Sequence, residues 1–96
     1  MSPLKRKKLS KIRFELDKLD NSLIKLIKKR TNLVKKVLEL KEKKNQIIDQ
    51  KRIKSILQNI RKKSLKSNID PKITNRIWKN MIWSYIDFEK RNFKKK

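Results

Sequence analysis

The sequence contains no cysteine, no histidine and no glycine among its 96 residues. Without cysteine and histidine the chain can form no disulfide and no zinc site of the usual ligand sets, and it has no thiol nucleophile or imidazole acid–base group. Turns with positive φ and sheet bulges usually use glycine, so its absence favours long helices joined by few, simple connections. Any chemistry must therefore use lysine, arginine, carboxylates, hydroxyls, amides and the shape of a site.

Long apolar runs are also missing, and none approaches the roughly 20 residues that span a bilayer. The N-terminal segment MSPLKRKKLSK is basic but lacks the apolar stretch of a signal peptide, so we expect a cytoplasmic protein with no membrane association. Only 35% of residues are apolar and 42% are charged. A lone domain this small and polar buries little surface, so we expect it to oligomerise.

Acidic residues are scarce, and the formal net charge is +22. Such a charge is typical of nucleic-acid-binding proteins, and a basic helical dimer that binds nucleic acid is one hypothesis. However, lysine, isoleucine and asparagine are all abundant, as in proteins from AT-rich genomes, and the cations cover nearly every polar face instead of one stripe. We therefore favour composition bias over nucleic-acid binding. The same positive field would also steer a small anionic substrate.

Apolar residues in the first half of the chain recur at alternating spacings of three and four residues. This pattern predicts one continuous helix from about Leu4 to Lys44. A helix of some 40 residues is about 60 Å long, whereas a globule of this chain length is about 30 Å across. We therefore predict an intertwined homodimer in which two such helices pair. The apolar positions are Leu9, Ile12, Leu16, Leu19, Leu23, Leu26, Leu33, Val37 and Leu40.

Two shorter helices are predicted after a loop at residues 43–46. The second runs from about Asp49 to Lys66, and the third begins at Pro71, with Asp70 as its N-cap. The fold class is therefore all-α, with one long and two shorter helices in a single domain of residues 1–96. Its core spans about residues 9–93, and we expect the basic ends 1–8 and 94–96 to fray. The third helix should place Ile73, Ile77, Trp78, Met81, Ile82, Tyr85 and Phe88 inward.

One position on the apolar seam of the first helix is charged, Arg30. It could pair with a carboxylate of the protein or, since acids are few nearby, with an anionic ligand. Lys41 follows eleven residues later, about three turns, and so returns to within roughly 20° of the same face. Arg13 lies roughly 100° around the helix from Arg30. Arg30 and Lys41 can therefore address one pocket, while Arg13 addresses another, which in a dimer can be that of the partner.

Carboxylates in the other two helices have both structural and functional interpretations. Glu89 ends the aromatic stripe of the third helix, and taken alone it reads as a carboxylate at the solvent-exposed end of that helix. Beside a basic pocket it could instead be a functional hydrogen-bonding group. Asp49 is a good N-cap for the second helix, and Arg52, one turn later, could equally be a solvated surface residue.

Taken in order, these segments resemble the AroQ-type, all-helical chorismate mutases along nearly the whole chain, from Leu9 to Phe93. No single motif is decisive, but their order and spacing together are fairly specific. The matching segments are Ile12-Arg13, Leu16-Asp17-Lys18-Leu19-Asp20, Leu23 to Arg30, Leu33-Val34-Lys35-Lys36-Val37 leading to Lys41, Asp49 with Arg52, and Ile69-Asp70-Pro71.

The resemblance implies a domain-swapped homodimer with two shared active sites and no cofactor or metal. It implies the rearrangement of chorismate to prephenate, in aromatic amino-acid biosynthesis. It also implies that Arg13 of one subunit, with Arg30 and Arg52 of the other, binds the substrate carboxylates. Lys41 would bind the ether oxygen and a carboxylate, and Asp49 would lie near the substrate hydroxyl. The last family position, usually glutamine or glutamate, is Glu89, and Lys41, Glu89 and Arg30 are the predicted catalytic residues.

Two positions depart from the mutase pattern. The residue after Arg52 is commonly a glutamate that contacts the substrate hydroxyl, and here it is Ile53. The serine four residues before the last catalytic position is replaced by Tyr85, which we expect to bind the substrate together with Glu89. Both changes resemble the isochorismate-pyruvate lyases of the same fold, which release pyruvate and leave salicylate. Their last catalytic position is usually glutamine, so Glu89 does not favour the lyase. We therefore favour the mutase and keep the lyase as the alternative.

Overall fold

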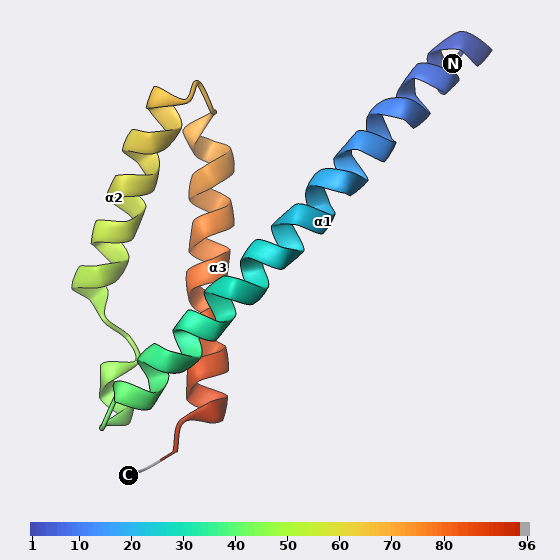
Figure 1. Ribbon diagram of the computed structural model, residues 1–96. Coiled ribbons are helices and arrows are strands. Elements are labelled where there is room, and N and C mark those ends of the chain that lie inside the picture. Colours follow the sequence, from blue (N-terminus) through green and yellow to red (C-terminus); the bar gives the residue numbers. More distant parts are fainter. Residues whose placement is uncertain (95–96) are drawn as a thin grey trace. The chain divides into compact units, whose positions relative to one another are not determined.

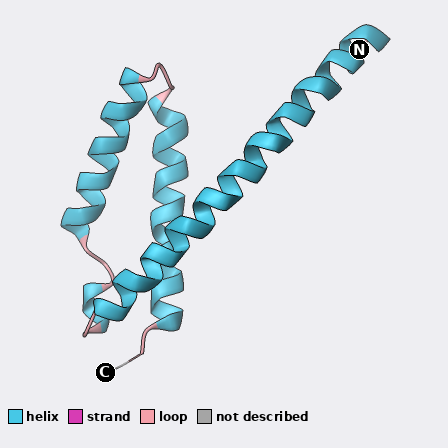
Figure 2. Ribbon diagram, viewed as in Figure 1, coloured by secondary structure: helices cyan, strands magenta, loops and turns pink. Residues whose placement is uncertain are grey.

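The computed structural model describes residues 1–94, and over that range helices joined by short loops are the only secondary structure (Figures 1 and 2). Helix α1 spans Pro3–Leu40, the short 3-10 helix η1 spans Lys44–Gln46, and helices α2 and α3 span Gln50–Lys66 and Pro71–Asn92. The prediction of an all-α chain with one long and two shorter helices is confirmed. None of the described helices is long and apolar enough to cross a membrane. Two of the C-terminal lysines that we expected to fray, Lys95 and Lys96, lie outside the described residues.

Helix α1 begins and ends earlier than the sequence pattern predicts. It starts at Pro3, so residues 3–8, which we expected in a frayed end, are helical. It stops at Leu40, four residues before the predicted end at Lys44. The side chain of Gln46 offers a reason, because its Oε1 accepts hydrogen bonds from the backbone N–H groups of Glu42 and Lys43, at 2.7 and 2.9 Å. These amides thereby gain partners outside a helix, and the turn brings Ile47 into the core, where it is 3% exposed.

Helix α2 begins and ends with two recognisable caps. Asp49 Oδ1 accepts a hydrogen bond from Arg52 N at 3.0 Å, which confirms Asp49 as the N-cap. At the other end Asn68 adopts a positive φ of 56° and takes the place that glycine usually occupies. The N–H groups of Asn68 and Ile69 donate to the carbonyl oxygens of Leu65 and Ser64, at 3.3 and 2.9 Å. This is the Schellman arrangement, achieved without glycine.

Helix α3 starts directly after this turn and runs back along α2, as Figure 1 shows. Asp70 Oδ1 accepts from Lys72 N at 2.9 Å and Pro71 occupies the first turn, as predicted. A hydroxyl pair also joins the two helices, since Ser64 Oγ and Thr74 Oγ1 lie 2.7 Å apart and Ser64 is only 3% exposed. The C-terminal cap of α2, the N-terminal cap of α3 and this hydroxyl pair together stabilise the closed end of the α2–α3 hairpin.

The chain divides into two compact units, residues 1–33 and residues 34–96. The core of the second unit is small: its buried hydrophobic residues are Ile47, Ile82 and Ile86. Partly buried side chains pack against these three from the end of α1, from the loop, from α2 and from the chain end. They are Leu38, Ile48, Ile53, Ile56, Leu57 and Phe93. So few buried residues make a weak core for a domain of this size.

The prediction of which α3 residues face inward is right for the centre of the helix and wrong for its start. Trp78, Met81, Tyr85 and Phe88 are partly buried and Ile82 is buried, as expected. Ile73 and Ile77, in contrast, are 55% and 49% exposed in the single chain. The buried face instead continues toward Ile86 and Glu89, because α3 packs against α2 and the loop with that side.

In the first unit, α1 presents its apolar seam without cover. No residue of this helix is buried. Leu9 is half-buried, and the seam residues that follow it in this unit are all more than half exposed: Ile12, Leu16, Leu19, Leu23, Leu26 and Leu33.

Candidate active site

The second unit brings together two of the predicted catalytic side chains. Lys41 Nζ lies 3.0 Å from Glu89 Oε1 and donates a hydrogen bond to it within an ion pair. The side chains are 18% and 7% exposed. Forty-eight positions separate the two residues in sequence, so tertiary folding forms this contact. A charged pair removed from solvent to this extent is costly unless both charges are used, which makes the pair a functional-site candidate.

Glu89 is buried, at 5% exposure for the whole residue. Its interpretation as a carboxylate at the solvent-exposed end of an amphipathic helix is therefore wrong. On α3 the positions one turn before Glu89 are Tyr85 and Ile86, so the carboxyl group shares the apolar face of the helix. Ile86, one turn before Glu89, belongs to the buried hydrophobic cluster, and this explains why Glu89, at the end of the aromatic stripe, is not in contact with water.

Lys41 lies just beyond α1, where its backbone N–H still donates to the Leu38 carbonyl oxygen at 3.1 Å. The helical angle that we used to place Lys41 on the face of Arg30 assumes a helix that continues through residue 41. Because α1 ends at Leu40, that angle does not apply to Lys41. Its position instead follows from the turn held by Gln46, a residue that the sequence reasoning did not single out. The only signal for Gln46 was a polar residue in the predicted loop.

Asp49 and Arg52 are adjacent through the N-cap hydrogen bond of α2. Both residues are exposed, and the bond uses the backbone of Arg52, so its guanidinium group remains available to a ligand. Ile53, next along α2, packs against the hydrophobic cluster. An aliphatic side chain there cannot accept a hydrogen bond from a substrate hydroxyl. Tyr85 is half-buried one turn before Glu89.

The two predicted site arginines of α1 belong to the first unit, where Arg30 is half-buried and Arg13 is exposed. The contacts of the second unit thus assemble the Lys41–Glu89 pair and the Asp49–Arg52 turn. Within the described residues there is no group of three or more acidic side chains able to hold a metal ion. What remains is a buried carboxyl group paired with an ammonium group, on a strongly basic chain: a site that can bind and polarise an anionic molecule.

Comparison with known proteins gives two matches. The family model for chorismate mutase type II matches residues 12–90. A chorismate mutase from Methanocaldococcus jannaschii is 38% identical over 76 residues, which cover 78% of this chain and 77% of that protein. No solved structure matches the chain significantly.

Proposed function

This chain belongs to the type II chorismate mutase family, and from that premise we propose that it is an isomerase that converts chorismate to prephenate. The observation that carries the proposal is the Lys41–Glu89 pair, because the family resemblance assigns these two residues to the breaking ether bond. We further propose that residues 1–96 form one domain of this family, with its core at about residues 9–93.

The reaction is an intramolecular Claisen rearrangement, which needs no nucleophile, metal or cofactor. The substrate is a dicarboxylate that must be held in a compact conformation, and fixed cations can do this. Arginine suits the task because its planar guanidinium group binds a carboxylate through two hydrogen bonds and stays charged. In the proposal Arg30 and Arg52 bind the carboxylates, and Arg13 of the partner subunit completes the site.

Negative charge grows on the ether oxygen as its bond breaks. A donor directed at that oxygen stabilises the transition state more than the substrate, and this difference raises the rate. Lys41 supplies one donor in the proposed site, and a protonated Glu89 supplies the other. A millionfold acceleration corresponds to about 8 kcal/mol. Two charge-assisted hydrogen bonds at roughly 1.5–3 kcal/mol each leave the remaining few kcal/mol to conformational selection.

A homodimer with intertwined α1 helices is part of the proposal. Its support is the uncovered seam of α1, on which Leu16, Leu19 and Leu23 are 53%, 62% and 53% exposed. Soluble proteins rarely leave so long an apolar stripe in water, and a second α1 helix has the same spacing and so the matching surface. Such pairing would also bring Arg13 of one subunit to the site of the other.

The alternative substrate is isochorismate, which a lyase of the same fold would convert to salicylate and pyruvate. One observation favours the lyase. Ile53 packs against the hydrophobic cluster, at the position where the mutase pattern has a glutamate that binds the substrate hydroxyl. Glu89, in contrast to the usual glutamine of the lyases, favours the mutase.

One experiment tests the proposal and its alternative. The purified protein is incubated separately with chorismate and with isochorismate, and prephenate, salicylate and pyruvate are quantified. We expect prephenate from chorismate, and a loss of turnover in the Arg30→Ala variant. Salicylate with pyruvate as the main products would show the lyase instead. If neither substrate reacts and the protein binds nucleic acid with an affinity that Arg30→Ala leaves intact, the chain is a basic nucleic-acid-binding protein.

A further inference from the structure

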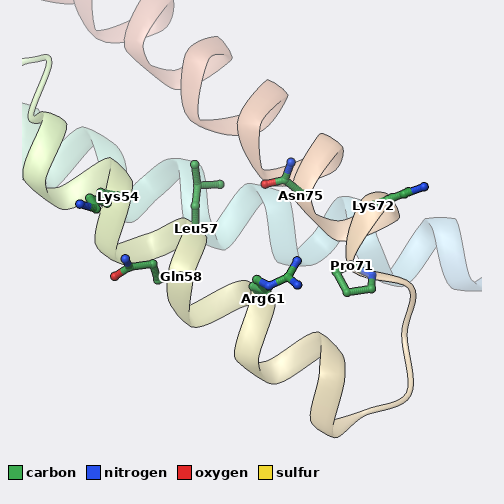
Figure 3. Close-up of a pocket in the computed structure, with 7 residues that line it drawn as sticks. All are labelled: Lys54, Leu57, Gln58, Arg61, Pro71, Lys72 and Asn75. Carbon is green, nitrogen blue, oxygen red and sulfur yellow. The ribbon is translucent and has the colours of Figure 1, made fainter.

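A second concave site lies between α2 and α3, in a part of the hairpin that the proposed reaction does not use. The pocket has a volume of about 350 Å³. Figure 3 shows its lining residues, which come from the middle of α2 and the first turns of α3. They are Lys54, Leu57, Gln58, Arg61, Pro71, Lys72 and Asn75. This volume is at the lower end for ligand sites and is enough for one six-membered ring with a substituent.

The lining contains no carboxylate, and its surface is mainly apolar. Its residues include three cations, Lys54, Arg61 and Lys72. In Figure 3 the polar groups of Arg61 and Asn75 extend between the helices, whereas the ends of Lys54, Gln58 and Lys72 point away from the gap. None of the three cations has an ion pair with a carboxylate among the described residues. In Figure 3 the guanidinium group of Arg61 extends from α2 toward the start of α3. The pocket therefore offers a carboxylate a bidentate partner that no protein group occupies.

Apolar atoms form most of the lining. Leu57 is half-buried and points into the gap between the helices in Figure 3, and the half-buried Pro71 ring lines the other end of the pocket at the start of α3. A purely ionic ligand such as phosphate would leave these surfaces in contact with water. A ring would cover them, and burial of apolar area adds to the affinity.

The pocket is distinct from the proposed substrate site. Arg61 follows Arg52 by nine positions on the same helix, about two and a half turns, so the two arginines project from roughly opposite sides of α2. Arg52 therefore cannot direct its guanidinium group into the pocket, and neither Lys41 nor Glu89 lines it.

We propose that this pocket binds a small organic anion, a carboxylate carried on a ring-sized apolar body. Arg61 pairs with the carboxylate, Asn75 donates a hydrogen bond from its amide group, and the apolar side chains of Leu57 and Pro71 contact the ring. The three positive charges disfavour ligands that also carry an ammonium group. This inference does not depend on which reaction the chain catalyses.

The test is a titration of the full-length, ¹⁵N-labelled protein with benzoate at low ionic strength, followed through the backbone amide resonances. We expect saturable shifts at Leu57, Arg61 and Asn75. Benzyl alcohol, which has the ring without the charge, and inorganic phosphate, which has the charge without the ring, should each bind at least several-fold more weakly. Equal binding of either probe would overturn the proposal, as would shifts that grow linearly without saturation.

Two variants separate the pocket from general electrostatics. Arg61→Gln should weaken benzoate binding about tenfold, because it removes the paired cation. Arg76→Gln makes the same change at an exposed position of α3 outside the pocket and should change affinity less than twofold. Equal losses in the two variants would show attraction to net charge alone. Benzoate could also enter the substrate site, so the titration is repeated with Arg52→Ala, which removes an exposed cation of that site without breaking a buried ion pair, and the pocket shifts must persist.

Discussion

Glu89 shows how one residue can be both a stability problem and a functional group. A carboxylate at 5% exposure loses most of its hydration, and the Lys41 ammonium group at 3.0 Å compensates for that loss. Removing one member of such a pair leaves the other charge buried without a partner. Replacing both by apolar side chains does not leave such a charge, so single and double variants should behave differently.

The Lys41→Met variant should lower the free energy of unfolding by about 3 kcal/mol, the lower part of the range for a broken buried pair, because Lys41 retains some exposure. The Lys41→Met/Glu89→Leu double variant should recover most of that loss. Urea denaturation measures both, with Lys43→Met, at an exposed loop position, as the control. A single variant as stable as the parent protein would show that the pair does not contribute to the fold.

Glu89 also offers a test of the proposed donor at the ether oxygen. Only the protonated carboxyl group can donate a hydrogen bond to that oxygen, whereas the carboxylate accepts one from Lys41. Glu89→Gln supplies a permanent donor of the same size, so kcat should be at least that of the parent protein, whereas Glu89→Leu, which has no donor, should lower kcat. The measurement is kcat of the three proteins. A Glu89→Gln variant as slow as Glu89→Leu would exclude this role for Glu89.

Among the helices, the start of α2 is where Asp49, the N-cap, is also a proposed substrate-binding residue. Asp49→Ala should destabilise the protein by about 1 kcal/mol, as expected for a lost N-cap. Asp49→Ser keeps a capping oxygen and should restore stability, but KM for chorismate should stay raised if Asp49 also contacts the substrate hydroxyl. Asp70→Ala, which removes the equivalent cap of α3, is the matched control. Asp70→Ala should lower stability and leave KM unchanged. A KM in Asp49→Ser equal to that of the parent protein would show that Asp49 acts only as a helix cap.

For the whole molecule, the central prediction is that two chains share each site. Mixing Arg13→Ala subunits with Arg30→Ala subunits should restore one intact site in each heterodimer, because the two substitutions then fall in the same one of its two sites. Turnover by the purified heterodimer should be about half that of the parent dimer, on the assumption of independent sites. The two homodimers, each with both sites damaged, are the controls. Verified heterodimers without activity would argue against intertwined chains.

The sequence by itself determined the helices and their caps. The three-four spacing of the apolar residues, the missing glycine, Asp49 and the Asp70-Pro71 pair are local signals, since a helix and its ends depend on residues within about four positions. The bounds that they predict for α2 and for the start of α3 agree with the structure to within one residue. They placed the end of α1 four residues too late, because Gln46 and the burial of Ile47 act from outside the helix.

Only the tertiary structure decided which of the candidate polar residues are buried and which of them meet. Whether Glu89 lies in water or in the core depends on the packing of α3 against α2 and the loop, contacts between residues far apart in the chain. For the same reason, the sequence could name Lys41 and Glu89 separately, but only the fold shows their charges 3.0 Å apart. The pocket at Arg61 likewise arises from two helices, and no spacing along one of them could reveal it.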